Sequence, residues 1–191
     1  MLSPYLSTDL PVDNLAGGIG HDSSSRLCLN RLEDICLAKT MANLLISYHS
    51  QSGSCARLAS AALRGARRES GAAVNLLRTW DAGSRDLRQT DGLLLVVAEN
   101  SGALSGGMKD FLDRIFYPAI AAELVIPYAL VVSAGNDGRG AVRQAETILS
   151  GIPFSPATEA LICRGSVTEQ HMADCEELGM GFAAGLVMGI Y

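Results

Sequence analysis

The chain is 191 residues long, 48% apolar and 18% charged, with a formal net charge of −5. An ordinary apolar fraction and a small net charge exclude an intrinsically disordered chain, and the length suits one domain. The 20 acidic residues outnumber 15 basic ones that form no basic run, which argues against nucleic acid as a partner.

The most apolar windows, residues 92–98 and 124–134, are far shorter than the ~20 residues that a membrane-spanning helix needs. The first thirty residues carry three aspartates and no continuous apolar core, so no secretory leader is expected. The five cysteines are irregularly spaced and form no CxxC pair, which argues against a disulfide framework and a zinc ribbon. We therefore expect a cytoplasmic protein with free thiols and no membrane partner.

Residues 1–40 differ in texture from the rest of the chain. Proline, glycine and serine are frequent over residues 1–25, and residues 26–39 carry only a thin apolar stripe. We interpret this part as an N-terminal extension, poorly ordered or forming a single helix; an added helix that contacts an oligomer partner is the alternative. The domain proper is predicted to span residues 41–191.

From residue 41 onward, five short runs that are apolar on both faces alternate with helical stretches, as in a parallel sheet covered on both sides. The predicted strands are Asn43–Tyr48, Ala73–Arg78, Gly92–Ala98, Pro127–Ala134 and Glu159–Cys163. Helices are expected after Gly53, around 108–116, over 138–149 and after a capping box formed by Ser166 and Glu169; only the segment 80–90 is unclear. This alternation predicts an α/β domain with a doubly wound parallel sheet, whose ligands bind beyond the carboxyl ends of the strands.

The loop after the first strand is rich in small hydroxyl-bearing side chains and leads into a helix. Free backbone N–H groups at a helix start favour an anion, and small side chains let the backbone wrap a phosphate. The residues concerned are Ser50, Gln51, Ser52, Gly53, Ser54 and Cys55. An ordinary serine-rich helix cap is the alternative interpretation, but it would need only one of these residues. A phosphatase with Cys55 as its nucleophile is disfavoured because Ala61 stands where that family has arginine.

The segment from Asp91 to Arg114 carries a more specific signal. It resembles the second flavin loop of the flavodoxin-like superfamily, and within it the NADPH-dependent FMN reductase branch, whose pattern is Pro-Glu-Tyr-Asn-Gly-Ser, then Gly-x-x-Lys and an Asp. The matching positions are Glu99, Gly102, Gly106, Lys109 and Asp113. The first loop, Tyr48–Gly53, similarly resembles the FMN phosphate loop of the superfamily.

This resemblance implies a flavodoxin-like three-layer sandwich with a five-stranded parallel sheet of order 2-1-3-4-5. FMN would lie across the ends of strands one, three and four, with its phosphate on residues 50–55. The isoalloxazine ring would be edged by Ala98, Glu99, Asn100, Ser101 and Gly102 and by Ala134, Gly135, Asn136 and Asp137. A plain surface turn is the alternative for residues 134–138. Departures from the family include Ala98 and Asn100, which replace a proline and an aromatic residue, and Cys55, which replaces a threonine common in flavodoxins.

The function that the resemblance implies is an FMN-binding oxidoreductase that takes a hydride from NAD(P)H and reduces a quinone, flavin or similar small acceptor. An electron carrier of the flavodoxin type and a flavin-free domain that keeps the fold are the alternatives. We name no catalytic residue and no metal ligand, because the chain forms no triad and no spaced His or Cys set. Reductases of this kind are often dimers or tetramers, so the resemblance points to a homo-oligomer.

Two other positions, His49 and Trp80, have two interpretations each. His49 beside the phosphate loop either assists an anion or faces solvent, and Trp80 is either a half-buried edge residue or a partner contact. Asp110 and Arg114 are expected to form a surface ion pair four residues apart.

Overall fold

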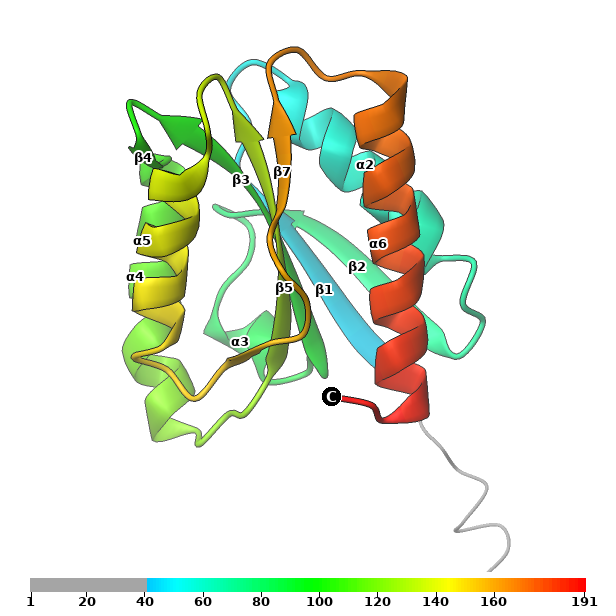
Figure 1. Cartoon of the computed structure of the whole chain (residues 1–191). Helices are drawn as coiled ribbons and strands as arrows, with labels where there is room; N and C mark the ends of the chain where they lie inside the picture. Colours follow the sequence, from blue (N-terminus) through cyan, green and yellow to red (C-terminus); the bar gives the residue numbers. More distant parts are fainter. Residues whose placement is uncertain (1–40) are drawn as a thin grey trace, which may run out of the picture. The chain divides into compact units, whose positions relative to one another are not determined.

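The computed structural model describes residues 41–191. The extension and helix predicted for residues 1–40 lie outside the described residues. In the described part, helices and strands alternate along the chain as the sequence predicts (Figure 1).

The sheet is built from five parallel positions. Its main strands are β1 (Ala42–Tyr48), β2 (Ala72–Arg78), β3 (Gly92–Asn100) and β5 (Pro127–Ala134), in the order β2-β1-β3-β5. The fifth position is shared by two short strands, β6 (Ser155–Pro156) and β7 (Leu161–Arg164), which pair with the start and the end of β5. Counted by position, this is the predicted order 2-1-3-4-5, which is confirmed.

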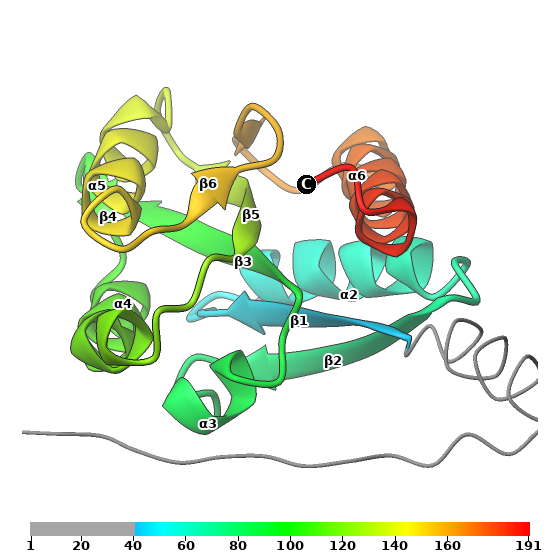
Figure 2. The ribbon, with the colours of Figure 1, turned by 90° about the horizontal axis from the view of Figure 1, so that it is seen from below.

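Five helices in the described range cover the two faces of the sheet. Helices α2 (Ser54–Ala66) and α6 (Glu169–Met188) lie on one face, and α3 (Ser84–Leu87), α4 (Gly106–Ala121) and α5 (Arg139–Leu149) lie on the other (Figure 2). The strands form the middle layer, so the architecture is the predicted three-layer α/β sandwich.

Alternation along the strands explains the two hydrophobic cores. On β1, Leu44 and Ile46 pack with α2 and α6, whereas Leu45 packs with the cluster under α3, α4 and α5. All three side chains are at most 2% exposed. A parallel strand with both faces buried needs apolar residues at consecutive positions, and this is the pattern that the sequence shows.

One local expectation is corrected, and one unclear segment is resolved. Helix α6 is capped by Thr168, whose Oγ1 accepts the His171 N–H at 3.2 Å, while His171 Nδ1 accepts the Thr168 N–H at 3.3 Å. The predicted capping box of Ser166 and Glu169 has the same chemistry but begins two residues before the observed one. The unclear segment 80–90 contains only the one-turn helix α3.

None of the helices described in residues 41–191 is long and apolar enough to cross a membrane.

Candidate functional site

The three loops predicted to bind a ligand lie at one edge of the sheet. They follow β1, β3 and β5, which are parallel neighbours, so their carboxyl ends meet there. Asn100 Nδ2 donates a hydrogen bond to Gln51 Oε1 at 3.3 Å, which joins the first loop to the second. The Asn136 N–H donates to Glu99 Oε2 at 3.2 Å, which joins the second loop to the third. The structure therefore brings the three predicted segments together as one unit.

The first loop is shaped by its own hydroxyl groups. Ser50 Oγ accepts the Gly53 N–H at 3.1 Å, and Ser52 Oγ donates to Ser54 Oγ at 3.3 Å. Gly53 is the N-cap of α2 and has φ +93°, a left-handed conformation that glycine adopts without steric cost. Among the described residues, α2 receives no side-chain cap and has no acidic residue in its first turn. Its free N–H groups are available to an anion.

Cys55 belongs to this loop by its backbone only. Its thiol is 2% exposed and packs in the core between the sheet, α2 and α6, where Cys163 and Cys175 also lie. Burial, and secondarily the neighbouring Cys163, raises the pKa of Cys55 to about 12. A thiol that stays protonated at neutral pH is a poor nucleophile, so Cys55 could contribute only its N–H group to an anion site.

The second loop is a tight β-hairpin, which the sequence reading missed. Strand β4 (Ala103–Leu104) pairs antiparallel with the end of β3, with Asn100 opposite Ala103. The two turn residues, Ser101 and Gly102, have φ values of +52° and +76°. Positive φ at both central positions matches a type I′ turn, and a Ser-Gly pair after a strand is a signal that could have indicated it.

Helix α5 holds this hairpin from one side. The Leu104 N–H donates to Gln144 Oε1 at 2.8 Å. Gly140, in the first turn of α5, approaches the Gly102 backbone so closely that an added Cβ would lie 1.8 Å from the Gly102 carbonyl oxygen. A side chain at position 140 would therefore displace the second loop.

The third loop contains the buried Ala134 and the exposed residues Gly135, Asn136 and Asp137. Asp137 Oδ1 accepts the Arg139 N–H at 3.1 Å, and Gly138, with φ +74°, is the N-cap of α5. Because Asn136 also binds Glu99, this segment is tied to the second loop rather than being an isolated surface turn.

The open space and the donors of these loops fit a phosphate ester joined to a flat ring. A Cβ added at Gly53, Gly102 or Gly135 would meet no atom within 4 Å, so the backbone of each loop can be approached closely. The donors at the first loop are backbone N–H groups and serine hydroxyls, all uncharged, a set that suits phosphate at a helix start. Residues 98–102 and 134–137 contain no aromatic side chain, so a ring there would contact mainly backbone and small side chains.

Beside the first loop lies His49, whose burial the sequence did not indicate. His49 is 4% exposed, and its Nδ1 lies 3.0 Å from the Ser105 Oγ. The exposed ring of Trp80 meets the His49 ring edge to face, with ring centroids 5.0 Å apart. His49 is therefore not a solvent-facing residue. Trp80 is 58% exposed, more than a half-buried edge residue would be.

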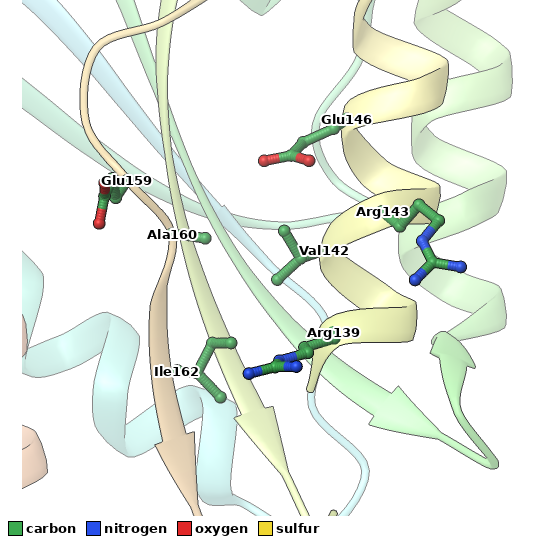
Figure 3. Close-up of a pocket in the computed structure, with 7 residues that line it drawn as sticks. All are labelled: Arg139, Val142, Arg143, Glu146, Glu159, Ala160 and Ile162. Atoms are coloured by element: carbon green, nitrogen blue, oxygen red, sulfur yellow. The ribbon is translucent and has the colours of Figure 1, made fainter. Parts of the chain in front are cut away.

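Two hollows of the surface lie away from the three loops. One of about 400 Å³ lies between α5 and the strand β7 (Figure 3). It has an apolar floor that includes Val142 and Ile162, with Arg139 near one end and the carboxylates of Glu146 and Glu159 near the other. Another of about 240 Å³ lies at the amino end of β1, near α3. Within residues 41–191, no group of three His, Cys, Asp or Glu side chains is placed to hold a metal ion.

The surface pair predicted on α4 is present. Arg114 Nε donates to Asp110 Oδ2 at 2.8 Å, and the same guanidinium donates to the Ala82 carbonyl at 3.0 Å. Lys109 and Asp113, two positions of the family pattern, form a second exposed pair with 2.6 Å between Nζ and Oδ2. Both matched residues thus bind each other on the outer surface of α4.

No protein-family model matches the chain, and no curated protein matches it either. Solved structures do match. A flavodoxin from the domain Archaea is 17% identical with a TM-score of 0.67, over 75% of this chain and 98% of that one. A WrbA-like flavodoxin from Agrobacterium tumefaciens is 15% identical with a TM-score of 0.64, over 77% of this chain and 98% of that one.

The Flv1 flavodiiron core from Synechocystis sp. PCC6803 is 20% identical with a TM-score of 0.67, over 87% of this chain. Only 41% of that longer chain is covered, so the likeness concerns one part of it. At these identities the comparison concerns the path of the backbone. Together with the strand order 2-1-3-4-5 and the two helical layers, it assigns this chain the flavodoxin-like fold.

Proposed function

We propose that this domain binds FMN at the edge formed by its first, second and third loops. The observation that carries the proposal is the pair of hydrogen bonds that joins them, Asn100 to Gln51 and Asn136 to Glu99. Ligands of open α/β sheets bind beyond the carboxyl ends of the strands, at the switch point of the sheet, and these bonds join the three loops at that edge.

The residues have separate roles in this proposal. The N–H groups at the start of α2, with the hydroxyls of Ser52 and Ser54, hold the phosphate without a cationic side chain. The hairpin turn at Ser101 and Gly102 and the exposed Gly135 edge the ring from opposite sides. Bound FMN would supply hydride acceptance and electron transfer, and the protein would position and tune it. No side chain is assigned as a general acid or base.

For turnover, we propose reduction of a small acceptor such as a quinone or free flavin by NAD(P)H, as the family resemblance implies. An electron carrier of the flavodoxin type is the second candidate, and the archaeal flavodoxin and WrbA-like matches support it as far as a shared fold can. A net charge of −5 is modest for a carrier that docks on positively charged partners. The cytoplasmic location and the homo-oligomer stay predictions.

The deciding experiment is titration of the full chain with FMN, followed by flavin fluorescence and by the thermal midpoint. A specific ligand must raise the midpoint as its concentration exceeds the dissociation constant. Riboflavin, which lacks the phosphate, should bind more weakly than FMN. A colourless protein whose midpoint stays unchanged with millimolar FMN would refute the proposal.

The variant Ser54→Asp sharpens this test. Ser54 is the first residue of α2, so a carboxylate there interacts favourably with the helix dipole, by about 0.3–1 kcal/mol. The same charge opposes a phosphate. We therefore expect a variant that is as stable as the wild type or more so, yet binds FMN much more weakly, while its affinity for riboflavin stays the same.

Steady-state kinetics separates the two candidates for turnover. A reductase loaded with FMN oxidises NADH or NADPH in the presence of a quinone. A yellow, FMN-loaded protein that fails to do so with either nucleotide is a carrier.

A further inference from the structure

The buried polar side chains of residues 41–191 gather in one corner of the domain. Only Ser47, His49, Thr79 and Ser105 are polar and buried among these residues, and each is at most 4% exposed. Burying a polar group costs free energy unless it is hydrogen-bonded. The hydroxyls of Ser47 and Thr79 have no partner among the described atoms. These unpaired buried hydroxyls lie next to the proposed cofactor loops. Their position there indicates a role other than stabilising the fold.

The strand geometry explains why these residues meet. Ser47 and His49 are two positions apart at the end of β1, so both side chains point to the face covered by α4. Thr79 follows β2, which pairs in register with β1, and its N–H donates to the Tyr48 carbonyl at 3.0 Å. Ser105 comes from the opposite direction, as the residue that precedes α4.

Ser105 has the position of a helix cap but does not act as one. Its Oγ lies 3.0 Å from His49 Nδ1, and no side-chain cap bonds the first turn of α4 among the described residues. A serine N-cap normally accepts a backbone N–H, and giving this up removes a hydrogen bond that stabilises the helix. The hydroxyl is instead directed at a residue that lies 56 positions earlier in the sequence.

The imidazole is held in place from its other sides. Gly107 leaves the space that the ring fills, because a Cβ there would lie 2.7 Å from both His49 Nε2 and the nearest Trp80 ring carbon. Arg114 on α4 donates to the carbonyls of Thr79 and Ala82 and so fixes the loop that carries Trp80. The ring therefore has one position, set by β1, α4 and the loop after β2.

We propose that His49 is a positioning residue of the cofactor site, acting through Ser105. His49 directly precedes the phosphate loop, and Ser105 directly follows the second-loop hairpin. Their hydrogen bond therefore sets the distance between the two loops inside the domain. The Asn100–Gln51 bond does the same at the surface. This inference rests on the proposed function, because its effect is measured as FMN affinity.

The protonation state of the ring supports this role. Burial lowers the pKa of His49, so the ring is neutral at pH 7. A neutral imidazole has one donor and one acceptor nitrogen, and the Ser105 hydroxyl can complement either one.

The test compares FMN affinity in four variants of the full chain and in one control variant. His49→Leu and Ser105→Ala each remove the bond, and the double variant removes both partners. His49→Gln keeps a group that can hydrogen-bond Ser105. Asp91→Ala is the matched control, because it removes a 2.7 Å hydrogen bond to the Asn43 N–H at the opposite edge of the sheet.

We expect His49→Leu and Ser105→Ala each to weaken FMN binding about tenfold, which is ~1.4 kcal/mol of binding free energy, because loops that are no longer held together must be brought into position when FMN binds. The double variant should lose the same tenfold, because the residues act as one unit. His49→Gln should recover most of the affinity. Asp91→Ala should unfold more easily but bind FMN like the wild type.

Several results would overturn the inference. Wild-type affinity in His49→Leu would exclude a positioning role, and additive losses in the double variant would show that His49 does not act through Ser105. An equal loss of FMN affinity in Asp91→Ala would show that the effect comes from lower overall stability. If the wild type itself failed to bind FMN, both the proposed function and this inference would be wrong. That outcome is distinguishable from the others because it concerns the wild type and not a variant.

Discussion

Replacing Gly140 by alanine probes the contact on which the second loop depends. In the structure, an added Cβ would lie 1.8 Å from the Gly102 carbonyl oxygen, while ordinary van der Waals contact begins at 3.4 Å. Because the backbone fixes the position of a Cβ and the other partner is a backbone carbonyl oxygen, no side-chain rotation can relieve the overlap. Helix α5 and the hairpin must therefore separate by about 1.6 Å along this contact.

The energetic cost follows from three contributions. Overpacking of this kind costs about 1–3 kcal/mol, and losing the bond from the Leu104 N–H to Gln144 would add ~1 kcal/mol. Alanine has a higher helix propensity than glycine, which offsets at most ~1 kcal/mol of this cost. We therefore expect a net loss of about 1–3 kcal/mol. For a domain of this size that lowers the thermal midpoint by about 3–10 °C.

The assay is thermal unfolding by circular dichroism, followed by FMN titration of the same sample. Gly181→Ala is the control, because Gly181 lies in α6 and an added Cβ there meets nothing within 4 Å. That variant should be slightly more stable than the wild type and bind FMN equally well. Gly140→Ala should be less stable and bind FMN more weakly, since its second loop has moved.

One result would refute this reasoning. If Gly140→Ala matched Gly181→Ala in thermal midpoint and the wild type in FMN affinity, the close approach of α5 to the hairpin would not exist in the protein.

Three further predictions concern the stability and reactivity of the domain. Because burial lowers the folded-state pKa of His49, the unfolded chain takes up a proton first as the pH falls below about 6.5. The free energy of unfolding should therefore decrease as the pH falls from 6.5 to the folded-state pKa of His49. Urea titrations should show a smaller decrease in His49→Gln, and the same dependence on pH in both proteins would contradict this. Gly65→Ala should destabilise by about 1–3 kcal/mol, because its Cβ would lie 1.7 Å from the Glu176 carbonyl oxygen where α2 and α6 cross; a normal urea midpoint would disprove that crossing. Cys55, with its pKa raised to about 12, should resist iodoacetamide at pH 8 until the domain unfolds, as peptide mass spectrometry can measure; rapid labelling of the folded protein would show that the thiol is accessible.

The order of elements could be predicted from local patterns. The apolar runs at 43–48, 92–98 and 127–134 are strands whose bounds the structure reproduces within two residues. They are recognisable because a strand buried on both faces needs consecutive apolar residues. The serine-rich loop could be predicted to begin a helix for an equally local reason, since small residues and a glycine are what its backbone requires.

Local patterns could not indicate which polar residues are buried. His49 and Ser105 look like ordinary loop residues in the sequence, yet each is at most 4% exposed and they bind each other. The hairpin at Ser101 and Gly102 was missed because β4 has only two residues, too few for an alternation pattern.

The sequence by itself determined the fold class, the strand order that the resemblance implied and the three segments that meet at one edge. The fold class and the three segments depend on periodicity and on residue types at neighbouring positions, whereas the strand order is what the resemblance implies. The tertiary structure alone decided how the segments are joined: Gln51 to Asn100, Glu99 to Asn136, and His49 to Ser105. Each of these bonds links residues 37–56 positions apart, so it depends on strand register and helix packing, which no local pattern specifies.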